Sequence, residues 1–361
     1  MQGVTQTCGM VGASTAAMHL PFRRTTLPAL SLALQGGGAH GAFTWGVLDA
    51  LLERGVPIAA ASGASAGAMN AVVLAHGLVQ GPQLGASEAA RTALHDFWHA
   101  IAERVPPLWR VPGDPPQLSA GASAMLAWSR WLAPTQLNPL NLNPLRDVLA
   151  AQIDFERLRA SRGMALFVAA TEVARGRMTL VRRAEITLDA VLASAALPSM
   201  AHAVTLDGRA HWDGAFSANP ALWPLVREVD ADDLVLVTLS PLGEAAEPSS
   251  AQAIAARVGE IAFHAPFLRE ARWLAELHAD ARARAWPRWG TDRRLARLRW
   301  HLLDADDTLA KLPGSTRLVP EWTFVQRLRD AGRARVARWF EEHGTAVGRR
   351  SSIDALRVFG A

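Results

Sequence analysis

The most reactive pattern in the sequence is Gly-Ala-Ser-Ala-Gly at residues 63–67, which has the form G-x-S-x-G. An apolar run at 56–61 precedes it and apolar residues at helical spacing follow it, so it lies between a predicted strand and a predicted helix. A tight turn there would strain Ser65 and expose its oxygen at the carboxyl end of the strand, facing the positive end of the helix. The five residues alone are weak evidence, and the strand–turn–helix context is what makes Ser65 a candidate nucleophile.

A second glycine-rich turn, Gly-Gly-Gly-Ala-His-Gly at residues 36–41, also lies between a predicted strand and a predicted helix. Successive glycines can direct backbone N–H groups toward an oxyanion or a phosphate. The phosphate-binding P-loop ends in Gly-Lys-Ser/Thr, whereas this loop ends in His-Gly-Ala. The dinucleotide pattern G-x-G-x-x-G does match, but the acidic residue expected about twenty positions later is missing between Arg54 and Gly67. These departures weaken the nucleotide interpretation and favour an oxyanion hole.

The tripeptide Asp213-Gly214-Ala215 offers the base that a serine nucleophile needs. It directly follows a hairpin predicted at 203–212, with Asp207-Gly208 at the turn. A lone Asp-Gly pair is most often only a turn, so this tripeptide gains meaning from the two patterns before it.

The loop at 36–41, the turn at 63–67 and the tripeptide at 213–215 occur in an order and spacing that resemble the patatin-like phospholipase family. The segment Ala-Ser-Ala-Ala-Leu-Pro at 193–198 is also similar to a recurrent family segment, and the resemblance spans roughly residues 30–245. Family members usually carry Arg or Lys where this chain has His40, and this departure affects the charge of the loop rather than its backbone.

The resemblance implies a role for each of these residues. Ser65 would attack the acyl carbonyl of a lipid or phospholipid substrate and form an acyl-enzyme, and Asp213 would accept the serine proton. No metal or cofactor is implied. Backbone N–H groups of the two turns would hold the oxyanion, namely those of Gly36, Gly37, Gly38 and Ala66.

A Ser-Asp-His triad on an α/β-hydrolase fold is the main alternative mechanism, because His202, His211 and His264 all follow Ser65 in the chain. Two features oppose it. The serine follows only the second predicted strand, and the glycine loop belongs to the strand immediately before it. His211 is separated from Asp213 by one residue, so both could face the same side of a strand and His211 could assist.

The order of elements predicts a three-layer α/β/α fold with a mainly parallel central sheet. Apolar strand patterns occur at 29–34, 56–61, 164–170, 177–182 and 234–239, and short helices separate the first of them. We expect a loose tail at 1–28, with Met1 or Met18 as the start, and an acyl-hydrolase domain at 29–245. Within this domain, the proline-rich segment 78–162 is predicted to be a lid-like helical insertion. Helical patterns dominate the predicted C-terminal region at 246–361.

The charge of the chain is unevenly distributed. The formal net charge is +4, but residues 251–361 carry 20 basic and 13 acidic residues, a local net charge of +7. Between 282 and 299, seven arginines surround Trp286 and Trp289, a composition found in helix packing, at membrane surfaces and in nucleic-acid sites. We expect peripheral binding to anionic membranes by this stretch or by the segment 78–162, and no nucleic-acid partner.

The cysteine content and the lengths of the apolar runs limit the classes of function that the protein can have. Cys8 is the only cysteine, which excludes an internal disulfide and is compatible with the cytoplasm, where we expect the protein to reside. No run of eighteen uncharged apolar residues occurs.

Serine lipid-acyl hydrolysis is the leading prediction. The alternatives are a general carboxylesterase or acyltransferase with the same dyad, and a non-catalytic membrane-binding regulator. The sequence defines neither the headgroup nor the oligomeric state.

Overall fold

The structure is a computed structural model that describes residues 27–81, 85–129, 131–242, 247–284 and 289–360. Of the tail predicted at 1–28, only Leu27 and Pro28 fall within these ranges.

The centre of the fold is an eight-stranded sheet in the order β10-β9-β1-β2-β5-β8-β7, with β6 also paired to β5. The strands from β10 to β5 are parallel, whereas β6, β7 and β8 pair antiparallel to their neighbours. This confirms the predicted mainly parallel sheet. Its strands are β1 (Leu30–Leu34), β2 (Ile58–Gly63), β5 (Ala165–Glu172), β6 (Arg177–Arg182), β7 (Val204–Leu206), β8 (Arg209–Asp213), β9 (Asp233–Thr238) and β10 (Arg299–Asp304).

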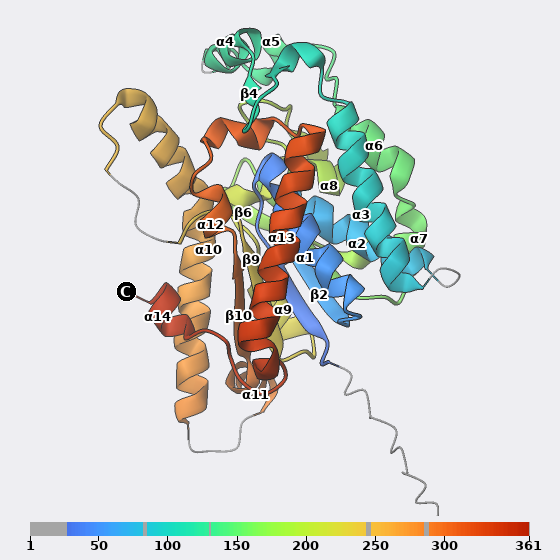
Figure 1. The fold of residues 1–361 in the computed structure, drawn as a ribbon, viewed down its shortest axis with the longest axis vertical. Coiled ribbons are helices and arrows are strands. Elements are labelled where there is room, and N and C mark those ends of the chain that lie inside the picture. Colours follow the sequence, from blue (N-terminus) through green and yellow to red (C-terminus); the bar gives the residue numbers. More distant parts are fainter. Residues whose placement is uncertain (1–26, 82–84, 130, 243–246, 285–288, 361) are drawn as a thin grey trace, which may run out of the picture.

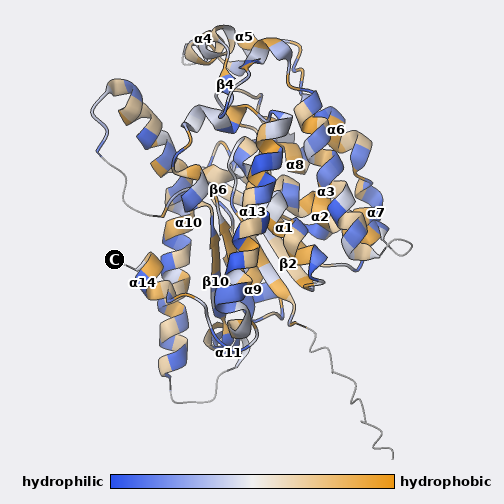
Figure 2. Ribbon diagram, viewed as in Figure 1, coloured by the Kyte–Doolittle hydropathy of each residue, from blue (hydrophilic) through white to orange (hydrophobic). Residues whose placement is uncertain are grey.

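Helices cover both faces of this sheet, and the strand side chains alternate between them. On β9, Val235 and Val237 join one buried apolar cluster together with α1, α2, α3 and α13. Leu234 and Leu236 join the other cluster, with α9, α10, α11 and α14. Figure 1 shows α1 and α13 crossing in front of the sheet, and Figure 2 shows hydrophobic residues gathered along the strands.

The helices include long packed ones and several of a single turn or two. They are α1 (Gly41–Glu53), α2 (Ala66–Gln80), α3 (Ala86–Glu103), α4 (Ala120–Trp128), α5 (Pro134–Leu137), α6 (Pro144–Gln152), α7 (Phe155–Ala160), α8 (Leu188–Ser194), α9 (Trp223–Glu228), α10 (Ala251–Ala283), α11 (Gly290–Arg297), α12 (Asp306–Leu309), α13 (Trp322–His343) and α14 (Ala355–Phe359).

The C-terminal region is part of this core. The sequence predicted mainly helices beyond residue 245, but β10 extends the main sheet by pairing with β9. Helix α13 packs against α1, and Phe324 and Trp339 are buried in the same cluster as the first strands. The predicted boundary at residue 245 therefore does not separate two hydrophobic cores.

The predicted insertion at 78–162 is also only partly separate from the core. Helix α3 packs on α2 with Leu94 and Phe97 buried, and α6 buries Val148 and Leu149. The part between α3 and α6 contains α4, α5 and a two-stranded ribbon of β3 (Arg110–Val111) and β4 (Gln117–Leu118). Figure 1 shows this part at the upper end of the molecule.

Candidate active site

The two glycine-containing turns meet because their strands are parallel neighbours. Leu34, at the end of β1, is paired with Gly63, at the end of β2, so both turns leave the same edge of the sheet. Strand β5 lies on the other side of β2, with Gly63 opposite Val168. Strand β8 then pairs antiparallel with β5 and places Asp213 opposite Ala170. The register therefore brings all three predicted motifs to one edge.

Ser65 has the strained backbone that its motif predicts. Its φ of 51° and ψ of −126° lie in a region that residues other than glycine rarely adopt, at a cost of about 1–3 kcal/mol. The turn allows no side chain at Gly67, where a Cβ would overlap the carbonyl oxygen of Leu34. The N–H of Ser65 donates to the carbonyl of Ser194 at 3.0 Å and approaches the Ser194 hydroxyl at 3.1 Å. These bonds fix the elbow at the N-terminus of α2.

The glycine loop offers fewer free donors than the sequence predicted. The N–H of Gly36 donates to Asn219 Oδ1 at 2.7 Å, so it is not free to hold an oxyanion, and the prediction for Gly36 is wrong in this respect. The N–H groups of Gly37, Gly38 and Ala66 donate to no other group among the described residues. Gly38 has a φ of +58°, and a Cβ there would overlap the carbonyl of Arg317, so this position requires glycine.

Asp213 is fully buried at the end of β8. Its Oδ1 accepts the N–H of Ala215 at 2.8 Å, whereas Oδ2 forms no hydrogen bond of standard geometry within the described part of the chain. Burial raises the pKa of Asp213 to about 7, against the opposing effects of the Ala215 N–H and the nearby Ser65 side chain. A carboxyl with this pKa can exchange a proton with a neighbouring hydroxyl near neutral pH.

The three histidines of the triad alternative lie in other environments. His211 contacts the Thr179 hydroxyl through Nε2 and the Arg209 carbonyl through Nδ1, both at 2.9 Å. His202 bonds to the Asn138 carbonyl, and His264 stacks on Phe267. No hydrogen bond within the described residues joins any of them to Ser65 or Asp213.

Ser65 opens into a cavity of about 250 Å³ with mostly apolar walls. Helices α2, α3 and α6 supply one side, and a short helix η5 (Gly314–Leu318) with the residues after it supplies the other. Such a cavity suits an acyl chain. Its lining side chains include Met69, Phe97, Trp98, Ile101, Leu145, Leu197, Leu318 and Pro320.

Two positioning residues were missed by the sequence analysis. Asn219 holds Gly36 with Oδ1, and its Nδ2 donates to the Phe263 carbonyl of α10 at 3.3 Å. Ser194 holds Ser65 and lies in the segment 193–198 that resembles the family. The family-like segment was thus a usable signal for Ser194, whereas no local pattern marks Asn219.

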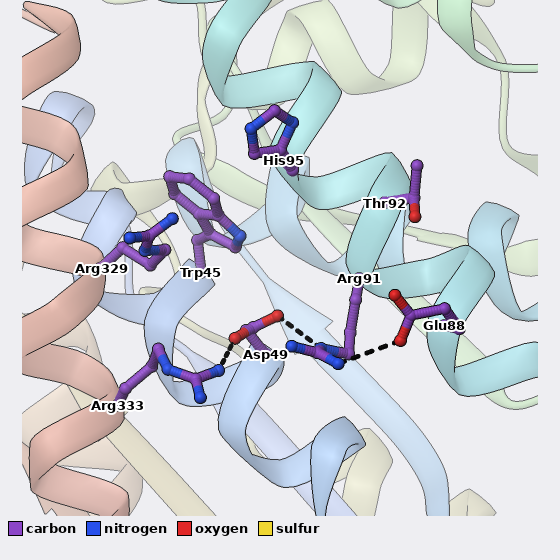
Figure 3. A pocket seen from close by; sticks show the side chains of 8 residues that line it. All are labelled: Trp45, Asp49, Glu88, Arg91, Thr92, His95, Arg329 and Arg333. Carbon is purple, nitrogen blue, oxygen red and sulfur yellow. Dashed lines mark hydrogen bonds and ion pairs between the residues drawn. The ribbon is translucent and has the colours of Figure 1, made fainter.

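A second cavity, of about 380 Å³, lies between α1, α3 and α13 and has a different character. Figure 3 shows Asp49 between the guanidinium groups of Arg91 and Arg333, which it binds as ion pairs. Each charged side chain that lines this cavity has an ion-pair partner. We therefore interpret the ion pairs around this cavity as the contacts that hold α13 against α1 and α3.

Two further properties bear on the class of protein. Among the described residues, no group of three or more His, Cys, Asp or Glu side chains could hold a metal ion. Within the same ranges, no helix combines the length and the apolar composition needed to cross a bilayer.

The strained turn at Ser65, the glycine loop and the buried Asp213 lie together at one edge of a mainly parallel sheet. Residues 32–226, just over half of the chain, match the family model described as patatin-like phospholipase. The chain therefore belongs to the patatin-like phospholipase family and is a hydrolase that acts on ester bonds.

Two solved structures are similar to this chain at low sequence identity. VipD from Legionella pneumophila is 16% identical, with a TM-score of 0.33, over 84% of this chain and 67% of VipD. A chain of the heterodimeric ExoU–SpcU complex, from the type III secretion system of Pseudomonas aeruginosa, is 17% identical. Its TM-score is 0.27, over 93% of this chain and 74% of that chain. No curated protein gives a significant sequence match.

Proposed function

We propose that the protein hydrolyses carboxylic esters of phospholipids or lysophospholipids through a Ser65–Asp213 dyad. The observation that carries this proposal is the buried, partly unsatisfied carboxyl of Asp213 beside the strained Ser65, at one end of an apolar cavity. Both features reduce the stability of the fold. A scaffold that only bound membranes would have no use for them, so they favour catalysis over the regulator alternative.

In the proposed first step, Ser65 Oγ bonds to the acyl carbonyl carbon while its proton passes to an Asp213 carboxylate oxygen. The carbonyl oxygen becomes negative and accepts hydrogen bonds from the free amides of Gly37, Gly38 and Ala66. The N-terminus of α2 adds a favourable field at the same place.

In the second step, the intermediate expels the glycerol oxygen, which takes the proton back from Asp213. Water then attacks the acyl-enzyme, its proton passes to Asp213, and collapse of the second intermediate returns that proton to Ser65 as the fatty acid leaves. Asp213 thus serves as base and acid in turn, which requires a pKa near the working pH. An acyltransferase would follow the same path with an alcohol in place of water.

The pKa of Asp213 predicts the pH dependence of the reaction. Because the free enzyme must hold Asp213 as a carboxylate, kcat/KM should rise about tenfold per pH unit below pH 7 and level off above it. The measurement is kcat/KM on a soluble activated ester between pH 5 and 9, with Asp207→Asn in the exposed hairpin turn as a control of unchanged profile. A flat profile across this range would indicate a carboxyl of ordinary pKa and would contradict the assignment.

Access to lipid is proposed to occur through an apolar surface at the outer end of the insertion. Between α3 and α6, five large apolar side chains are strongly exposed, and we refer to them as the upper apolar surface: Leu108, Trp128, Trp131, Leu140 and Leu142. Chain neighbours of this surface reach the cavity. Trp109, next to Leu108, donates its indole N–H to the carbonyl of Leu318 in the cavity wall at 3.1 Å, and Leu145, three residues after Leu142, also lines the wall. Exposed apolar patches of this kind suit a membrane interface.

The Arg/Trp stretch at 282–299 is less suited to bring the active site to a membrane. Trp286 lies outside the described residues. Helix α11 immediately precedes β10, so α11 lies at the amino edge of the sheet, opposite the edge that carries Ser65. Arg297 and Arg299 are paired with Asp232 and Asp233. We therefore place the proposed membrane contact on the upper apolar surface.

Membrane contact through this surface makes a specific prediction. The double substitution Trp131→Ser and Leu140→Ser should reduce co-sedimentation with anionic phospholipid vesicles by about tenfold or more, because each side chain loses apolar burial on the bilayer. Turnover of a soluble short-chain ester should remain within about twofold. Trp289→Ser, an equally exposed Trp at the opposite edge, is the matched control and should bind vesicles like the wild type. Equal binding by the wild type and the double variant would contradict this placement.

A further inference from the structure

Among the described residues that line the cavity containing Ser65, one has a charged side chain, namely Arg317. It comes from η5, well beyond the segment 32–226 that matches the family model. Its backbone lies next to the glycine loop, whose own residues include His40 but no arginine or lysine.

Contacts from both neighbouring residues hold Arg317 in place. Thr316 donates its hydroxyl proton to the Pro313 carbonyl at 2.6 Å, so it must accept from His40, whose Nε2 lies at 2.7 Å. On the other side, the Leu318 carbonyl accepts the indole N–H of Trp109. The backbone of Arg317 rests directly on Gly38, which leaves no room for a side chain there. These contacts hold the backbone of Arg317 against the glycine loop.

The positive charge of Arg317 has no partner within the described residues. Its Nε is buried without a hydrogen bond, and it forms no ion pair with any described acid. Glu260 on α10 is the acid that acts on it, and Glu260 is already paired with Arg257 at 3.3 Å. Burial lowers the pKa of Arg317 and also that of His40, to about 3, so the neighbouring imidazole is neutral. A partly buried, unpaired guanidinium is unfavourable until an anion reaches it.

We propose that Arg317 binds the phosphate of a phospholipid or lysophospholipid substrate while the acyl ester lies at Ser65. A guanidinium can bind two phosphate oxygens at once, which would fix the headgroup relative to the reacting carbonyl. The inference rests on the proposed function and adds a headgroup requirement to it: the substrate carries an anionic phosphate. It also gives the C-terminal region a direct part in substrate selection.

The test compares two esters with the same acyl chain, palmitoyl lysophosphatidylcholine and monopalmitoylglycerol, in the same detergent micelles. Arg317→Met should lower kcat/KM on the lysophospholipid by about 10- to 100-fold, the loss expected for a charge-assisted hydrogen-bond pair, and change it less than threefold on the neutral ester. Arg317→Lys keeps the charge without the two-point geometry, so its loss should be smaller. Arg110→Met removes an arginine that is paired with Glu321 and does not line the cavity, and should keep the wild-type ratio.

The other outcomes are distinct. An equal loss on both esters, or no loss on either, would overturn the role of Arg317 while leaving the hydrolase proposal intact. The same holds if Arg317→Met only weakens inhibition by added palmitate, because the anion bound would then be the product carboxylate. A wild-type protein that hydrolyses neither of these esters nor a diacyl phosphatidylcholine would overturn the proposed function itself, and this inference with it.

Discussion

Ser65→Ala should lower ester hydrolysis by about 10⁴-fold or more, because it removes the atom that bonds to the acyl carbon. The fold should survive, since alanine preserves the backbone contacts of the elbow and removes only the hydroxyl. The measurement is kcat on a soluble activated ester, with folding checked by circular dichroism.

Ser62→Ala is the matched control for this variant. Ser62 lies on β2, three residues before Ser65, and its buried hydroxyl has no hydrogen-bond partner within the described residues. Its removal should leave the rate within about twofold. A folded Ser65→Ala protein with near wild-type activity would remove Ser65 from the mechanism.

Asp213→Asn should lower the rate by about 10²–10⁴-fold, because the amide keeps the shape of the carboxyl but cannot accept the serine proton. His202→Ala, His211→Ala and His264→Ala should each stay within about threefold of the wild type, since none of these rings is hydrogen-bonded to Ser65 or Asp213 within the described residues. Comparison of the aspartate variant with the three histidine variants distinguishes a Ser-Asp dyad from a Ser-Asp-His triad. One folded histidine variant as inactive as Ser65→Ala would support a triad instead.

Asp213→Asn should also be more stable than the wild type at alkaline pH. An unfolded aspartate loses its proton near its ordinary pKa of 3.8, whereas the pKa of the buried Asp213 is about 7. The folded wild type therefore binds the extra proton between these values and loses stability as the pH rises through this window. Asparagine does not ionise, so between pH 5 and 8 the stability of Asp213→Asn should gain on the order of 3 kcal/mol relative to the wild type. Denaturant unfolding at the two pH values measures this difference, and an unchanged difference would indicate that Asp213 ionises normally.

Much of the fold could be predicted from the sequence because the relevant patterns are local. The run of apolar residues at 29–34 and the glycines after it predict a buried strand and a turn, and β1 at Leu30–Leu34 confirms the strand. The hairpin turn at Asp207-Gly208 is likewise confirmed, with positive φ at both residues. Strand β10 was missed because its residues, Arg-Trp-His-Leu-Leu-Asp, mix charged and apolar side chains. The hydrogen bonds of Arg299 and His301 with Asp233 make that mixture compatible with burial at the sheet edge.

In the candidate site, too, sequence patterns indicated some features, whereas contacts between distant residues determine others. The resemblance to the family pointed to Ser65 and Asp213, whose catalytic roles remain predictions, but the state of the loop depends on contacts far apart in the chain. Gly36 was expected to be a free donor, and only the fold shows Asn219, 183 positions away, accepting its N–H. Arg317 reaches the cavity because β10 and α13 return the C-terminal region to the glycine loop, and no pattern around residue 317 signals this.

The most direct test of the central claim is labelling with a fluorophosphonate, which reacts with an activated serine hydroxyl. Peptide mass spectrometry of the labelled wild type should place a single adduct on Ser65, and Asp213→Asn should be labelled far more slowly. Ser65→Ala should take up no label, whereas Ser62→Ala should be labelled like the wild type. A folded wild-type protein that is labelled elsewhere, or not at all, would contradict the account.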